Sequence, residues 1–248
     1  MREGINGFVI FLLALAVPPA ARAGRLEVMT YDISWLGMTV GGMTVQEERR
    51  NDAILRTIRV RSRPWVGTLY HVDSTVRCLI EPTPEGPCHT VSKVLAEGDF
   101  VQNDTLLLWP ATGTCIWSNA VAQTCTTSSV PASAQDAVSF FFDLRDALSR
   151  GSGASGDYRL IMDGAAHALE IKTGASKKIK TAFGKTDATA VSAVSKSPTL
   201  FARNKPKDIW VAKARPAVLA VDMSTALGTV HATLQSWTVD GAEVKIGD

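Results

Sequence analysis

The chain has 248 residues, with 26 basic and 24 acidic side chains and a net charge of +2. Such a small surplus excludes the strongly basic surface of a nucleic-acid-binding domain, so we expect no nucleic-acid partner. Apolar residues make up 46% of the chain, which is enough for a substantial core.

The first 23 residues have the pattern of a secretory signal peptide. Arg2 precedes an apolar run from Gly7 to Val17, and Ala21-Arg22-Ala23 is a small-x-small cleavage site. The run is too short for a permanent membrane anchor, and no later apolar run reaches membrane length. The sequence therefore predicts cleavage after Ala23, a periplasmic location and one β-rich domain over residues 24–248 without a transmembrane anchor.

Most of the remaining chain alternates between apolar and polar residues, which is typical of strands. Met29, Tyr31, Ile33 and Trp35, for example, alternate with polar neighbours. Strands are predicted at 29–35, 40–50, 54–63, 70–80, 88–97, 100–109, 114–117, 123–128, 158–162, 168–173, 177–183, 188–194, 209–212, 217–223 and 229–239. Gly41-Gly42 indicates a bulge or a close-packing point in the second strand.

Three arginines share one face of the third predicted strand. Arg59, Arg61 and Arg63 alternate with apolar or small residues. One interpretation is a site for an anion or a phosphate group. The other is the solvated face of an antiparallel strand, with Glu47 and Glu48 of the preceding strand as partners. The sequence favours the solvated face over the anion site.

One amphipathic helix is predicted, over about 133–150. Ala137, Phe141, Leu144 and Leu148 recur at helical spacing, so Phe141 and Leu144 are expected to be buried under a sheet. Ser133 is the predicted N-cap, with the acidic Asp136 three residues on, and Gly151 is the predicted C-terminal cap.

Four cysteines in an exported chain predict two disulfides. Cys78 and Cys88 lie on either side of a cluster of turn residues, and so do Cys115 and Cys125. Because each pair is separated by ten positions across a predicted turn, the expected pairing is Cys78–Cys88 and Cys115–Cys125.

Motifs that would assign a reaction or a cofactor are missing. There is no H-E-x-x-H, G-x-S-x-G or C-x₂-C pattern, so we assign no catalytic, metal or cofactor-binding residue and expect no cofactor. Gly151 to Gly156 matches G-x-G-x-x-G, but it follows a helix and precedes a strand, the reverse of a dinucleotide site. His71 and His89 could face each other across the first hairpin, where an ordinary polar role is favoured over metal binding. The basic run from Lys172 to Lys185 favours a solvated face over a surface for anionic lipid or glycan.

Four segments resemble the bacterial exported family called domain of unknown function 3108. They are Tyr31-Asp32-Ile33-Ser34-Trp35-Leu36-Gly37 with Val40-Gly41, Asp136 to Arg145, Ile161-Met162-Asp163-Gly164, and Ile209-Trp210 with Arg215 to Val218 and Leu227 to Val230. Ala137 stands where the family often has Pro, which is harmless at a helix N-terminus. Val211-Ala212-Lys213-Ala214 replaces its usual acidic polar turn.

The resemblance implies a fold similar to the half-barrels of periplasmic lipoprotein carriers. We therefore expect a mainly β protein in which a single curved antiparallel sheet, a half-barrel or open barrel, wraps round the helix at 133–150. The family brings no activity with it, so the carrier comparison is one of fold alone.

The leading functional hypothesis is non-enzymatic binding of an acyl chain, a lipid or an envelope protein. Three consecutive Phe residues span too much of the helix for one sheet to cover. Part of the Phe set must therefore line the sheet margin, a loop, a partner or a cavity. Coverage by the 115–125 hairpin or the 197–206 link is slightly favoured, and the candidate apolar cavity has the lining Phe140, Phe141, Leu144, Leu148 and Trp35. The alternatives are a structural role in the envelope without a small ligand and, third, a hydrolase whose nucleophile and base meet only in the folded chain.

Overall fold

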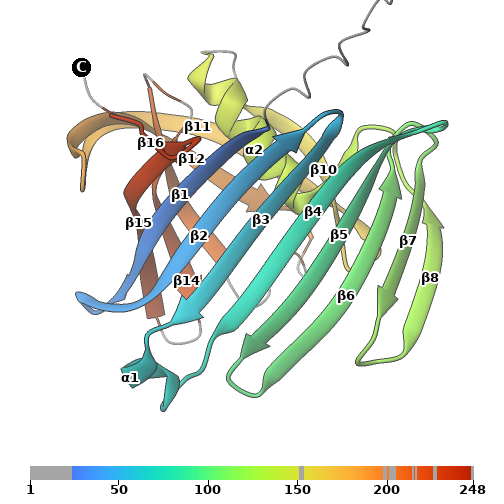
Figure 1. The fold of residues 1–248 in the computed structure, drawn as a ribbon, viewed down its shortest axis with the longest axis horizontal. Coiled ribbons are helices and arrows are strands. Elements are labelled where there is room, and N and C mark those ends of the chain that lie inside the picture. The colour runs from blue at the N-terminus through green and yellow to red at the C-terminus, as the bar shows by residue number, and fades with distance from the viewer. Residues whose placement is uncertain are drawn as a thin grey trace, which may run out of the picture.

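In the part of the chain that the structure describes, sixteen strands form one continuous, strongly curved sheet with a single long helix against its inner face (Figure 1). The computed structural model describes residues 24–150, 154–197, 200, 205–213, 215, 217–225 and 228–246. The proposed signal peptide lies outside these residues. The predicted fold class, a mainly β open half-barrel with one main helix, is confirmed.

The first eight strands of the chain form one arm of the sheet. They are β1 (Arg25–Trp35), β2 (Met38–Arg50), β3 (Ala53–Ser62), β4 (Asp73–Thr83), β5 (Gly86–Glu97), β6 (Phe100–Trp109), β7 (Thr114–Asn119) and β8 (Thr124–Ser129). A short helix, α1 (Pro64–Gly67), lies between β3 and β4 where the sequence predicts a break.

The other arm begins with β9 (Ala134–Asp136), which leads into the helix α2 (Ala137–Ser149). Its further strands are β10 (Gly156–Met162), β11 (Ala165–Thr181), β12 (Gly184–Ser195), β13 (Lys205–Ala212), β14 (Val218–Thr225), β15 (Gly228–Val239) and β16 (Ala242–Glu243). The sheet order is β8 to β1, then β15 to β9, so β1 and β15 join the two arms. All pairings are antiparallel except β9 with β10.

Turn chemistry sets most of the boundaries. Leu36 and Gly37 have positive φ between β1 and β2, and Asp163 and Gly164 do so between β10 and β11. The turn predicted at Gly174 is wrong, because β11 passes through it with a register irregularity between Thr173 and Ser176.

Alternation along the strands decides which face is inner. Met29, Tyr31 and Val45 are buried on the inner face, and the Tyr31 hydroxyl donates a 3.0 Å hydrogen bond to the backbone oxygen of Val218 on β14. Because β1 and β14 are separated in the sheet by β15, this bond reaches across its concave side. Burial raises the pKa of this phenol above its usual value, and the positive charge of Arg145 offsets the effect only in part.

The helix begins later than predicted. Asp136, not Ser133, is the N-cap, and its Oδ1 accepts hydrogen bonds from the backbone N–H of Val138 (3.0 Å) and Ser139 (2.8 Å). Ala134 to Asp136 instead pair with β10 as a short parallel strand. The cap at Arg150 ends the helix, and Gly151 lies outside the described residues.

The buried face of α2 is rotated from the predicted one. Phe142 is fully buried with Val138 against Met29 and Val45, whereas Phe140 and Leu144 pack against the second arm. Phe141 lies between the two core clusters and is only partly buried, so the prediction of a buried face centred on Phe141 is corrected; Leu144 is buried as predicted. Both arms of the curved sheet cover this helix.

One buried ion pair anchors α2 to the first arm, and a second lies within that arm beside the helix. Arg145 on α2 donates to both carboxylate oxygens of Glu27 on β1, at 3.0 and 3.4 Å. Arg56 on β3 donates to Glu47 on β2 at 2.8 Å. The guanidinium carbon of Arg56 lies 4.7 Å from the centre of the Phe142 ring, and that of Arg145 lies 4.9 Å from it, so both positive charges contact this ring. Within the described residues, no helix is both long and apolar enough to cross a membrane.

Candidate functional site

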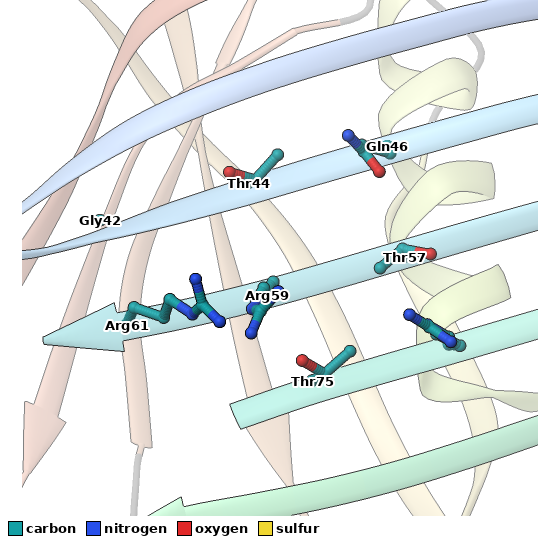
Figure 2. A pocket seen from close by; sticks show the side chains of 8 residues that line it. Gly42, Thr44, Gln46, Thr57, Arg59, Arg61 and Thr75 are labelled. Carbon is teal, nitrogen blue, oxygen red and sulfur yellow. The ribbon is translucent and has the colours of Figure 1, made fainter. Parts of the chain in front are cut away.

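A depression of about 500 Å³ lies on the outer face of β2, β3 and β4 (Figure 2). Its lining residues come from alternate positions of these strands and therefore point away from the core. They are Gly42, Thr44, Gln46, Thr57, Arg59, Arg61, Thr75 and Arg77. Figure 2 shows Arg59 and Arg61 side by side on β3, with α2 behind the sheet. We call this set the outer depression.

The outer depression carries excess positive charge. A single carboxylate, Asp73 on β4, contacts both Arg59 (3.3 Å) and Arg61 (3.2 Å). The Nε of Arg59 has no hydrogen-bond partner within the described chain. Arg77 is exposed, and its side chain makes no ion pair with any described residue. Two of the three guanidinium groups therefore share one carboxylate and the third has none, and this balance favours an anionic ligand.

Glycines shape the end of the outer depression nearest the β1–β2 turn. A Cβ at Gly41 would lie 2.6 Å from the backbone oxygen of Arg61, so the approach of β2 to β3 requires glycine there. A Cβ at Gly42 would have only the Tyr31 backbone oxygen within 4 Å, at 3.5 Å. Because glycine has no side chain, the outer depression is open at this position. The predicted bulge is also present: the register with β1 skips Val40, next to Gly41.

The partners predicted for the arginine row are wrong. Glu47 points to the inner face and binds Arg49 and Arg56, and Glu48 binds Arg50. Burial would raise the pKa of the Glu47 carboxyl, but hydrogen bonds and charge from Arg49 and Arg56 outweigh it and lower that pKa. Arg63 is exposed and lies 3.7 Å from Asp32 on β1, outside the outer depression.

Four of the five residues predicted to line an apolar cavity do come together. Phe140, Phe141, Leu144 and Leu148 lie in the core cluster of the second arm, where the Phe140 ring packs edge-on against Tyr158 at 5.0 Å. Trp35 is not among them. It lies at the opposite end of β1 from Glu27, the residue that binds α2, about 26 Å along the strand.

Neither predicted disulfide is present, because all four cysteines are free thiols. In the observed registers Cys78 pairs with Val91 and Cys88 with Glu81, so Cys78 and Cys88 are offset by three positions. Cys115 and Cys125 are offset equally, because Cys115 pairs with Ser128. An odd offset places the two side chains on opposite faces of the sheet, so neither bond can form.

A second polar group, the inner cluster, lies where α2 begins and consists of Cys78, His89, Asp136 and Ser139. The Oδ2 of Asp136 is 2.7 Å from His89 Nδ1, and the Ser139 hydroxyl is 3.3 Å from the same nitrogen. The Cys78 sulfur is 3.7 Å from Ser139 Oγ. Cys78, Asp136 and Ser139 are almost completely buried.

This arrangement does not have the geometry of a hydrolase triad. A triad needs the carboxylate on one imidazole nitrogen and the nucleophile on the other, whereas Asp136 and Ser139 share Nδ1 of His89. Burial also raises the pKa of the Cys78 thiol, which disfavours the nucleophilic thiolate. Burial would raise the pKa of Asp136 too, but hydrogen bonds from His89 and Ser139 outweigh burial and lower this pKa below its usual value. The carboxyl therefore stays ionised at lower pH than an ordinary aspartate does.

The predicted histidine pair and the basic run are both seen in the structure as separate, exposed or paired side chains. His71 is exposed ahead of β4, whereas His89 pairs with Ile80 near the other end of that strand, so the two do not face each other. In the basic run, Lys172 is exposed and pairs with Glu170. Lys177 is also exposed and lies over the ring of Trp210. The inner cluster was missed because its members are distant in sequence; the signal available was Asp136, which the sequence places beside a helix start.

A solved structure supports the fold assignment. The chain is similar to a β-barrel-like protein of domain of unknown function DUF1849 from Brucella abortus, with a TM-score of 0.56 and 9% sequence identity, over 86% of this chain and 97% of that one. At this identity the likeness concerns the fold alone. No curated protein matches the chain. Residues 30–235 match the family described as "Protein of unknown function (DUF3108)", and the chain belongs to that family.

Proposed function

We propose that this protein is a non-enzymatic binding protein of the cell envelope that holds a phosphate- or sulfate-bearing group in the outer depression. The observation that carries the proposal is the sharing of one carboxylate, Asp73, by two of the three arginines of a concave site. Export through the segment 1–23 is part of the proposal, and mature protein recovered from the periplasm with Gly24 as its first residue would support it.

The spacing of the arginines suits one tetrahedral anion. Arg59 pairs with Thr75, two residues from Arg77, so Arg59 and Arg77 are diagonal neighbours on adjacent strands. Their Cα atoms are then about 7–8 Å apart, within reach of a common anion for such long side chains. Thr44, Thr57 and Thr75 add hydroxyl groups that can donate to its remaining oxygens.

The test measures binding to vesicles and to inorganic pyrophosphate. Wild-type protein should co-sediment with vesicles that contain phosphatidylglycerol but not with pure phosphatidylcholine, and pyrophosphate should compete. Removing both guanidinium groups in Arg59→Ala/Arg77→Ala should weaken binding by about tenfold, since each exposed charge contributes on the order of 0.5–1 kcal/mol. Competition by pyrophosphate without vesicle binding would identify a soluble phosphorylated ligand in place of a lipid headgroup.

A charge-matched variant separates site binding from general attraction. Lys178→Ala/Lys180→Ala also removes two positive charges, but from the exposed surface of β11 on the other arm. It should bind as the wild type does. Equal weakening in the two double variants, or no binding to either probe, would refute an anion site at the outer depression.

Binding of an acyl chain is a second candidate function, and a different surface favours it. Beyond α2, the inner face presents Ile33, Met43, Ile58 and Val60, which are apolar but only partly buried. Phe141 is also partly buried and packs against the same core cluster as Met43 and Ile58. Displacement of a fluorescent fatty acid should then be saturable and weakened by Phe141→Asp, but not by Leu69→Asp at a site 85% exposed on the surface.

A further inference from the structure

We propose that Cys78, His89 and Asp136 form a site for one divalent zinc ion. A sulfur, an imidazole nitrogen and a carboxylate oxygen from these three residues all lie within 4.8 Å of one another. Thiolate, imidazole and carboxylate are the side-chain groups that bind zinc in proteins, and three such ligands with a fourth open position make a tetrahedral site.

The fold brings the ligands together from three elements. Cys78 on β4 pairs with Val91, two residues from His89 on β5, so the two are diagonal neighbours on the inner face of the sheet. Asp136 reaches them from the end of β9, where the chain enters α2 on the inner face of the sheet. A metal ion here would connect both strands to the helix.

Asp136 is already oriented as a ligand. Its Oδ1 is held by the backbone N–H groups of Val138 and Ser139, which leaves Oδ2 directed at His89. Such outer hydrogen bonds fix the direction of a ligating carboxylate. Oδ2 and His89 Nδ1 are 2.7 Å apart, and a shift of a few tenths of an ångström would admit a metal bonded at about 2.0 Å to each.

The charge at the site balances. On binding, the Cys78 S–H bond breaks, its proton passes to solvent and a zinc–sulfur bond forms, while His89 binds as neutral imidazole. Thiolate and carboxylate then neutralise the two charges of the ion. Arg56, the register neighbour of Cys78 on β3, has its own charge engaged by Glu47 at 2.8 Å. The Ser139 hydroxyl or a water molecule is available for the fourth position.

The test uses the full chain, reduced and stripped of metal, with Co²⁺ and then Zn²⁺ as probes. Wild-type protein should bind one Co²⁺ with a thiolate-to-cobalt absorption band that Zn²⁺ abolishes, and native mass spectrometry should show one zinc per chain. Cys78→Ser should lose the band and bind at least about 100-fold more weakly, since even outer-shell changes cost 10–100-fold. Cys115→Ser removes an equally buried thiol outside the cluster and should leave both signals unchanged.

Further variants keep the result interpretable. Asp136→Asn retains an N-cap acceptor while losing the anionic ligand, so it should stay folded and bind zinc more weakly. Cys125→Ser removes the one exposed thiol and tests for adventitious binding there. No uptake of either metal, or equal uptake by Cys78→Ser and wild type, overturns the proposal and leaves the cluster with its capping role only.

Discussion

Removing the Arg145 side chain should be among the most destabilising single changes in this protein. Arg145 and Glu27 are each 3% exposed as side chains, so Arg145→Met would leave a buried carboxylate with only the more distant and exposed Arg25, at 3.9 Å, as a charged partner. Breaking a buried pair from one side costs about 3–5 kcal/mol, a large share of the roughly 5–15 kcal/mol by which a domain is stable. The contact of the guanidinium with the Phe142 ring is lost as well.

The double variant Glu27→Met/Arg145→Met tests the reason for that cost. With both charges gone and apolar volume in their place, the loss should fall to less than half of the single-variant value, because the buried charge and not the missing contact is what destabilises. Urea denaturation followed by tryptophan fluorescence measures each free energy. Lys196→Met, which breaks an exposed pair with Asp157, is the control and should cost less than about 1 kcal/mol. A loss below 1 kcal/mol for Arg145→Met, or additive losses in the double variant, would refute the anchoring role.

Three further outcomes are expected. Phe142→Ala should cost about 3–5 kcal/mol in urea denaturation and Phe141→Ala clearly less, because only the first ring is fully buried; equal costs would contradict the assigned helix face. The lowered pKa of Asp136 stabilises the fold, and this contribution is complete at pH values above the ordinary aspartate pKa of about 3.9 and is lost as the pH falls through the folded pKa. Asp136→Asn should therefore flatten the acid limb of a curve of stability against pH. Thiol titration without reductant should give one rapidly reacting cysteine, Cys125, in the native protein and four after unfolding, whereas no free thiol after unfolding would refute the assignment of four free thiols.

Local patterns in the sequence were sufficient for the strands and for the existence of the helix. Alternation placed Met29 and Tyr31 on one face, and both are buried there. The helix start was harder to place, because Ser133 and Asp136 are both good caps by type. Pairing of 134–136 with β10, a contact distant in sequence, decides in favour of Asp136.

The cysteine pairing failed for a reason of register. Two cysteines ten residues apart across a turn face each other only if the turn is centred midway between them. The first hairpin turns after Thr83, so that Thr83 pairs with Gly86, and this shift moves Cys88 opposite Glu81. The curvature that brings Asp136 to His89 is a property of the whole sheet, and no short window of sequence encodes it.

The adjacency of β1 and β15 has a consequence for the kinetics of folding. Thr30 and Ser236, which share a 2.6 Å hydrogen bond across this pair, are 206 positions apart in the chain. The strand that completes the middle of the sheet is therefore synthesised long after its partner, and contacts of such high sequence separation fold slowly. Until β15 arrives, β1 is an open edge that carries Met29 and Tyr31 on one side. Unfolded and half-folded chains should thus persist for longer than in a barrel built only of consecutive hairpins, and their exposed apolar edge is what a chaperone would need to shield.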